Sequence, residues 1–217
     1  MPMRNRLTSY IFILLCTLLC ACDSGGMIEL FEGFTYGMPI NEVRKRAEAF
    51  PCPDDRRMLC RRSPAALFKT GWEQRFVFSA ERLVAVRLIT KETPKIRDDV
   101  NKWLDSGYRY MPVLIMSGGA KLDVLATLKA QGREGTREAI RQFARRTARD
   151  DKTTYLYLDF DKRENLLNDA ASYADLAAHA PRDLRGIEQT VEDEFLCLTF
   201  IAPIARAQDG AIPVAKK

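Results

Sequence analysis

The sequence is poor in histidine: His179 is the only one among 217 residues. A lone histidine cannot supply a triad, and its place before Ala180-Pro181, near an expected helix end, favours capping or surface exposure. No serine, cysteine or threonine comes with a recognisable base partner either. The sequence therefore predicts no catalytic residues, and a non-enzymatic role is favoured.

Motifs for metals and phosphates are also missing. Asp159 and Asp161 end an expected strand, where catalytic or Ca²⁺-binding carboxylates often lie, but two carboxylates are too few for a metal site. Ser117-Gly118-Gly119, expected between a strand and a helix, could offer backbone N–H groups to an anion. It lacks the further glycines, lysine and hydroxyl of a phosphate loop, so an ordinary turn is favoured. No metal or cofactor is expected.

The N-terminus lacks acidic residues and has the layout of an export signal. Arg4 and Arg6 precede an apolar run from Leu7 to Leu19. As a helix this run would span roughly 20 Å, whereas the hydrocarbon layer is about 30 Å thick. A permanent transmembrane helix therefore fits poorly.

Residues Leu19-Cys20-Ala21-Cys22 resemble the bacterial lipobox, in which two small residues precede the cysteine that is acylated. The resemblance implies removal of residues 1–21 and lipid on Cys22. Cys16 and Cys20 are poorer candidates because each follows a bulky leucine. Each buried CH₂ contributes about 0.8 kcal/mol, so several acyl chains would anchor the protein permanently. The alternative is a plain signal peptide with an incidental Cys22.

The expected location is the cell envelope, with the folded part facing the periplasm. Asp23 directly after the lipidated position favours the inner over the outer membrane, by the rule known in enteric bacteria. Removal of Arg4 and Arg6 with the signal lowers the net charge from +5 to +3. This near-neutral balance, in that compartment, predicts no nucleic-acid partner.

Three cysteines remain after the signal, in a compartment that favours disulfides. Cys52 and Cys60 bracket a polar loop and are the natural pair, with a disulfide that would stabilise the fold by roughly 2–3 kcal/mol. Cys197 lies in an apolar run and is expected to be a buried thiol. A redox or metal role for the three stays an alternative, although their spacing matches neither a C-x-x-C motif nor a zinc site.

Residues 31–90 predict a helix followed by a β-hairpin. A helix is expected from about Pro39, with Ile40, Val43, Ala47 and Phe50 on one apolar face, and Pro51 ends it. Residues 72–78 alternate with period two, and 83–89 form a second apolar strand after a turn. The helix is expected to pack on the apolar face of this hairpin.

This region resembles the SmpA/OmlA (BamE-type) small lipoproteins, through Gly37-Met38, Glu42-Val43 and the strand Arg82–Val86. The resemblance covers about residues 30–90. It implies helices packed on a small antiparallel sheet and an accessory scaffold role in envelope assembly. The sequence departs from the family at Phe50-Pro51-Cys52-Pro53, where Gly-x-Pro is usual, and a second helix is not evident. A generic helix-plus-hairpin module stays the alternative.

Residues 91–202 predict further helices and strands, which makes the fold class α+β with helices packed on antiparallel sheet. The expected helices lie at about 93–107, 120–132, 136–149 and 172–179, and the strands at 112–116, 154–160 and 194–201. No clean linker separates this segment from 31–90, so two domains and one composite domain both remain open. Residues 22–30 are expected to form a lipidated tether, and the tail 203–217 is expected to be disordered.

Arginines recur every fourth residue on the expected helix at 136–149, where Ile140, Phe143 and Ala144 mark the apolar side. The stripe consists of Arg133, Arg137, Arg141, Arg145 and Arg149. It could rest on anionic lipid headgroups, and the alternative is a solvated face interrupted by Glu134 and Glu138.

Two functions follow from these features. The favoured one is a membrane-anchored scaffold that binds another envelope protein. The alternative is a periplasmic small-ligand binder or enzyme that uses residues 112–161.

Overall fold

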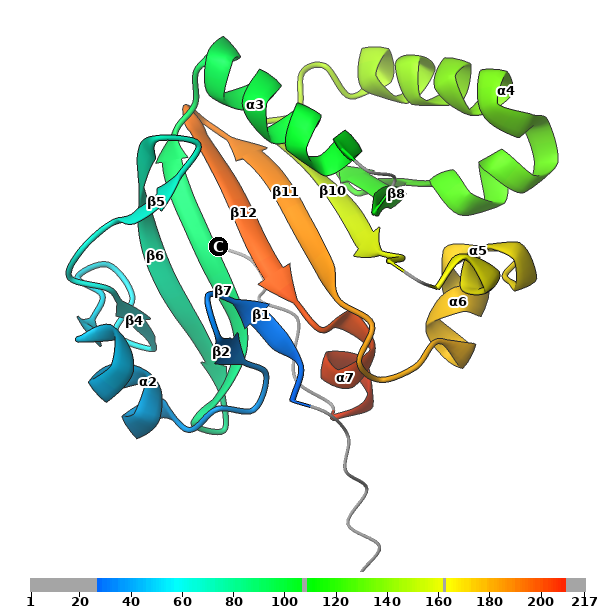
Figure 1. The fold of residues 1–217 in the computed structure, drawn as a ribbon. Coiled ribbons are helices and arrows are strands. Elements are labelled where there is room, and N and C mark those ends of the chain that lie inside the picture. Colours follow the sequence, from blue (N-terminus) through cyan, green and yellow to red (C-terminus); the bar gives the residue numbers. More distant parts are fainter. Residues whose placement is uncertain (1–26, 107–108, 162, 210–217) are drawn as a thin grey trace, which may run out of the picture.

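The computed structural model describes residues 27–106, 109–161 and 163–209, in which helices and strands are mixed and give the predicted α+β fold (Figure 1). Residues 1–21, Cys22 and Asp23, on which the lipoprotein prediction rests, lie outside the described residues. In chain order the elements are β1 (Glu29–Phe31), β2 (Phe34–Thr35), α2 (Ile40–Ala47), β3 (Phe50–Pro51), β4 (Met58–Cys60), β5 (Ala65–Leu67), β6 (Thr70–Ser79), β7 (Arg82–Lys91), α3 (Pro94–Asp105), β8 (Tyr110–Ser117), β9 (Ala120–Asp123), α4 (Val124–Arg146), β10 (Lys152–Asp159), α5 (Glu164–Asp169), α6 (Tyr173–His179), β11 (Gly186–Glu192), β12 (Phe195–Ile201) and α7 (Pro203–Gln208).

A single 10-stranded sheet organises the described part of the chain, and β1 and β2 form a separate two-stranded one. Its strand order is β3-β4-β6-β7-β12-β11-β10-β8-β9, with β5 paired to β6, and the pairs are antiparallel. The junction between β7 and β12 runs from Ala85, opposite Ile201, to Lys91, opposite Phe195. Residues 31–90 and 91–202 therefore contribute to the same sheet, and no boundary near residue 90 divides it.

The predicted hairpin is present as β6 and β7, and α2 begins at its turn. The backbone N–H of Ile40 donates to the carbonyl of Glu81 at 3.0 Å, and the N–H of Leu83 donates to the carbonyl of Met38 at 2.9 Å. These bonds fix the helix over the hairpin, so that Val43 is buried in the core, as the apolar spacing predicts.

The ends of α2 differ from the prediction. Pro39 has an extended conformation and caps the helix, which begins one residue later. Glu48, in the left-handed conformation with φ 48°, ends it early. Phe50 therefore lies outside the helix, in the edge strand β3, with 41% of its surface exposed. Its assignment to the apolar face was wrong because the helix stops before the third turn is complete.

Apolar residues fill both faces of the sheet. The first cluster lies under α2, α3 and β1–β2, which are in front of the sheet in Figure 1. Its large fully buried side chains include Trp72, Phe76, Leu88, Leu104, Leu196 and Leu198. The second cluster lies on the other face and includes Leu125, Leu158, Leu176, Leu184 and Ile204. Helix α3 begins as predicted, because the hydroxyl of Thr93 accepts from the N–H of Ile96 at 3.2 Å.

Of two expectations for the middle of the chain, one needs correction and one is confirmed. Ser117-Gly118-Gly119 leads into strand β9 instead of a helix, since Gly118 and Gly119 both have positive φ and make a tight β8–β9 hairpin. The two helices expected around Gly132 are present as the two segments of α4, which are separated by a kink at Gly132, where φ is 67° and ψ is −173°.

The predicted disorder from residue 203 is also wrong over its first part. Residues 203–208 form α7, with Pro203, Ile204 and Ala205 buried against the sheet. Apolar contact orders this segment, and residues 210–217 lie outside the described residues. Within residues 27–106, 109–161 and 163–209, no helix has the length and apolar character needed to cross a membrane.

Candidate functional site

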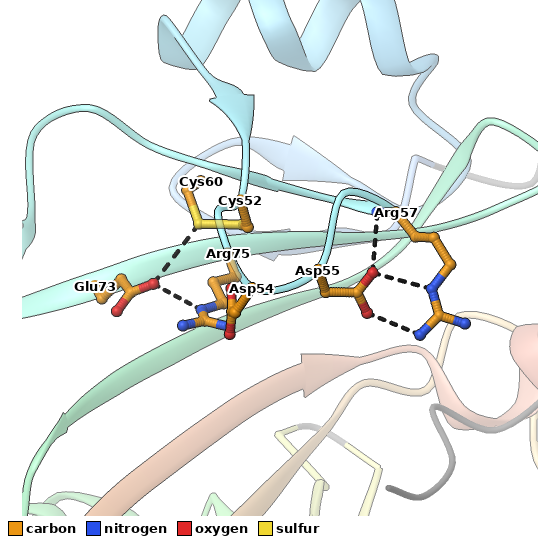
Figure 2. The surroundings of a disulfide bond; sticks show 7 residues. All are labelled: Cys52, Asp54, Asp55, Arg57, Cys60, Glu73 and Arg75. Atoms are coloured by element: carbon orange, nitrogen blue, oxygen red, sulfur yellow. Dashed lines mark hydrogen bonds and ion pairs between the residues drawn. A yellow bond between two sulfur atoms is a disulfide. The ribbon is translucent and has the colours of Figure 1, made fainter.

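Cys52 and Cys60 form the predicted disulfide, which closes the loop between β3 and β4 (Figure 2). Both residues are buried. Figure 2 shows how charged groups hold this loop: Arg75 of β6 pairs with Asp54 at 2.5 Å and Glu73 at 2.7 Å. The crosslink and the ion pairs make this a structural loop.

Cys197 is a buried free thiol, as predicted. It lies on β12, and its sulfur accepts a hydrogen bond from Nη2 of Arg87 at 3.3 Å. The described residues contain no group of three or more histidines, cysteines, aspartates or glutamates able to hold a metal ion.

Asp159 lies in a tight ion-pair cluster and is only 5% exposed. Its carboxylate accepts from Nη2 of Arg109 at 2.8 Å, from Nη2 of Arg185 at 2.6 Å and from the backbone N–H of Asp161 at 3.1 Å. Burial acts to raise the pKa of Asp159, but the hydrogen bonds and the two arginine charges outweigh it and leave that pKa below its ordinary value. Because a general base works best with a pKa near neutrality, Asp159 fits a structural role.

The carboxylate of Asp150 lies against the Ser117–Gly119 turn. The hydroxyl of Ser117 donates to the carboxylate of Asp150 at 2.9 Å, and that carboxylate packs on Gly118. The negative charge of Asp150 would repel an anion at this turn. The turn is also far from Asp159, because Ser117 pairs with Thr153 at one end of β10 and Asp159 lies at the other end, roughly 20 Å away. The residues expected for a ligand site in 112–161 are therefore not brought together.

The arginine stripe lies on the outer side of the second half of α4 and just beyond it, and all five arginines are exposed. We call Arg133, Arg137, Arg141, Arg145 and Arg149 the arginine face. Arg141 pairs with Glu138 at 2.9 Å, and the other four have no ion pair or hydrogen bond within the described part of the chain.

The side of α4 that faces the sheet differs slightly from the prediction. Ile140 and Phe143 pack against Ile115, as their spacing predicts, but Ala144 is exposed. His179 is exposed at the end of α6, with Nδ1 3.2 Å from the carboxylate of Asp175.

A groove that the sequence did not predict lies between α3 and the sheet, where Figure 1 shows α3 crossing in front of β11 and β10. We call it the α3 groove; its volume is about 430 Å³, within the usual range for ligand sites. Its lining residues are Arg97, Asn101 and Asp105 of α3, Thr153, Tyr155 and Tyr157 of β10, and Gln189 and Val191 of β11. The sequence signals this groove only through the regular spacing of its polar residues, which recur at every fourth position on α3 and every second position on β10.

Polar groups in the α3 groove remain available to a ligand. Gln189 is only 5% exposed and donates through Nε2 to Oδ1 of Asn101 at 3.2 Å, and its carbonyl oxygen has no partner among the described residues. The hydroxyls of Tyr155 and Tyr157 and the carboxylate of Asp105 likewise have none there. Burial, with the nearby charge of Asp105, raises the pKa of Tyr157, so its hydroxyl stays protonated.

A second cavity, of about 460 Å³, lies beside Ile28 and the β6–β7 turn. Its polar groups bind each other: the hydroxyl of Tyr36 donates to Asp209 at 3.0 Å, and Arg182 pairs with Asp209 at 2.7 Å. Burial and the bond to Asp209 raise the pKa of Tyr36 to about 12. These satisfied groups make the α3 groove the better candidate site.

No family model, no curated protein and no solved structure matches the chain. The resemblance to the SmpA/OmlA lipoproteins stays a prediction.

Proposed function

We propose that the protein is a lipoprotein of the bacterial envelope, anchored by lipid on Cys22, and that it acts as a non-enzymatic scaffold. Its folded part binds another envelope protein through the arginine face of α4. The observation that carries the proposal is this exposed face, in which Arg133, Arg137, Arg145 and Arg149 make no ion pair or hydrogen bond within the described residues. Unpaired guanidinium groups on a rigid helix suit a partner that presents carboxylates.

The entry of the chain into the fold supports anchoring close to the membrane. Met27 follows Cys22 by five residues, which span at most about 18 Å when extended. The next residues are held firmly, because the carbonyl of Ile28 accepts from the N–H of Tyr36 at 2.8 Å and Phe31 packs on Phe200 with ring centroids 4.7 Å apart. The tether therefore cannot lengthen without breaking β1 away from the sheet.

The position of α4 favours a protein, instead of the membrane surface, as the partner of the arginine face. Figure 1 shows α4 beside β8 at one edge of the sheet, whereas β1 lies over the central strands β7 and β12, towards the other end of the strands. The eight residues of β10 alone span roughly 26 Å, whereas the attraction of anionic lipid fades within a screening length of about 8–10 Å. A body anchored through β1 presents the arginine face away from the bilayer.

The test is crosslinking in cells with tagged full-length protein, followed by mass spectrometry of the captured partners. Arg137→Glu with Arg145→Glu reverses charge on the arginine face, and Arg44→Glu with Lys45→Glu is the matched control on exposed positions of α2. We expect the α4 variant to lose the captured partner at least tenfold, roughly 1.4 kcal/mol of binding, and the α2 variant to keep it. A partner captured equally by both variants would contradict the proposal. Loss of membrane attachment with an unchanged partner would instead assign the arginine face to lipid.

A further inference from the structure

The two ends of the α3 groove carry opposite charges. Asp105 lies at the last turn of α3 and Arg97 lies two turns earlier, both lining the groove. The two residues are eight positions apart along the helix, which is roughly 12 Å at 1.5 Å per residue. Nε of Arg97 forms an ion pair with the carboxylate of Glu92. The other guanidinium nitrogens of Arg97 make no hydrogen bond within the described residues.

The middle of the groove offers both a hydrogen-bond acceptor and donors. Gln189 presents its unpartnered carbonyl oxygen, and Asn101 keeps its amide nitrogen unpartnered because only its oxygen accepts from Gln189. An acceptor and a donor side by side match the N–H and C=O of a peptide bond. The carbonyl oxygen of Gln189 is accessible from the groove, so a ligand that donates to it replaces water.

Aromatic rings form the floor of the α3 groove. The rings of Tyr155 and Tyr157 lie on one face of β10, with centroids 6.5 Å apart and planes inclined by 31°. Val191 continues this surface on β11. Such a floor contacts aliphatic side chains or the Cα positions of a ligand, and the free hydroxyls of the tyrosines remain at its edge.

We propose that the α3 groove binds a short extended peptide with free termini, its ammonium group at Asp105 and its carboxylate at Arg97. A separation of roughly 12 Å corresponds to three or four extended residues at about 3.3–3.6 Å each. The central amides bond the peptide backbone, and the tyrosine floor packs against its side chains. This site is independent of lipid on Cys22 and of the arginine face.

The probe is tetra-alanine with free termini, titrated by calorimetry into the full-length chain in detergent micelles. We expect binding with a Kd below about 1 mM. Acetylation of the amino terminus and amidation of the carboxyl terminus should each weaken binding roughly tenfold, because each removes one charged hydrogen-bonding end.

Variants assign each end of the peptide to a residue. Asp105→Asn should remove the preference for a free ammonium but keep that for a free carboxylate, and Arg97→Gln should do the opposite. Asp98→Asn and Lys102→Gln remove the same charges from exposed positions of α3 outside the groove, and both should bind as the wild type does.

The crossed pattern separates recognition from misfolding, since a variant that merely unfolds loses every form of the peptide together. Absence of tetra-alanine binding up to about 10 mM, or equal binding of free and blocked peptides, would overturn the proposal. Binding of a neutral oligosaccharide such as chitotetraose that outcompetes the peptide would overturn it as well, in favour of a sugar site.

Discussion

Among single residues, Asp159 shows how this fold keeps a buried charge. Arg109 and Arg185 each retain more than a third of their side-chain exposure, at 40% and 36%, while the carboxylate between them is buried. The arginines can therefore be solvated without it, but the carboxylate cannot be buried without them. The contribution of these ion pairs is best tested by substituting the acid, Asp159.

We expect Asp159→Asn to lower the free energy of unfolding by about 1–3 kcal/mol at pH 7, since two charged hydrogen bonds are lost. The pKa of Asp159 is depressed in the folded state. Its contribution is therefore complete above the unfolded pKa of about 4 and is lost as the pH falls through the lower folded value. Urea unfolding at pH 7 and pH 3 measures this, and the difference between variant and wild type should shrink at pH 3. Asp161→Asn, at an exposed position, is the control and should change little. A difference independent of pH would contradict the assignment.

Local sequence sufficed for some residues and failed for others. Cys52 and Cys60 were predictable because they are only eight positions apart and bracket a polar loop, and Val43 because of its apolar spacing. Gln189 could not be assigned to a site, because its partner Asn101 lies 88 residues away. Its position in the groove depends on strand order, which no local pattern encodes.

Among the elements, α4 is the one whose shape depends on a single residue. Gly132 has a backbone conformation, φ 67° and ψ −173°, that is almost confined to glycine. It turns the chain between a first segment that packs in the second core cluster through Leu125 and a second segment that packs over β8 through Phe143. The predicted break between two helices at Gly132 is confirmed, whereas the expected start of the first helix was wrong because residues 120–123 form β9.

We expect Gly132→Ala to destabilise the protein by about 1–3 kcal/mol, although alanine normally stabilises a helix by about 1 kcal/mol relative to glycine. Nothing lies within 4 Å of the added Cβ, so the expected loss comes from the backbone alone. Thermal unfolding followed by circular dichroism measures the change, with Ala144→Gly, an ordinary exposed helical position, as reference. A rise in stability for Gly132→Ala would show that the kink relaxes freely.

Other elements escaped prediction for physical reasons. Strand β11 presents Ile187, Gln189 and Val191 to the α3 side, and the central glutamine breaks the apolar alternation by which strands are recognised. Strand β9 has only four residues and runs directly into α4, so its Leu122 reads as part of the helix. Helix α7 is short, and its order comes from burial against the sheet.

At the scale of the whole molecule, the proposed lipid on Cys22 would hold the folded body at a membrane. We expect Cys22→Ser to abolish metabolic labelling by an alkyne fatty acid and to release the protein into the soluble fraction. Cys20→Ser is the matched control and should keep both label and attachment, because residue 20 is removed with the signal. Labelled, membrane-bound Cys22→Ser protein would refute lipid anchoring at this residue.

The sheet also sets the order in which the protein can fold. Strand β7 ends at Lys91, but its neighbour β12 begins only at Phe195, and that pairing joins the two halves of the sheet. The intervening residues 92–194 must therefore emerge before β12 can pair with β7. During this interval the apolar edge of β7 has no partner strand and can pair with another nascent chain. Folding yield should therefore depend on chaperones that cover this edge of β7 until β12 arrives, more than on the final stability of the sheet.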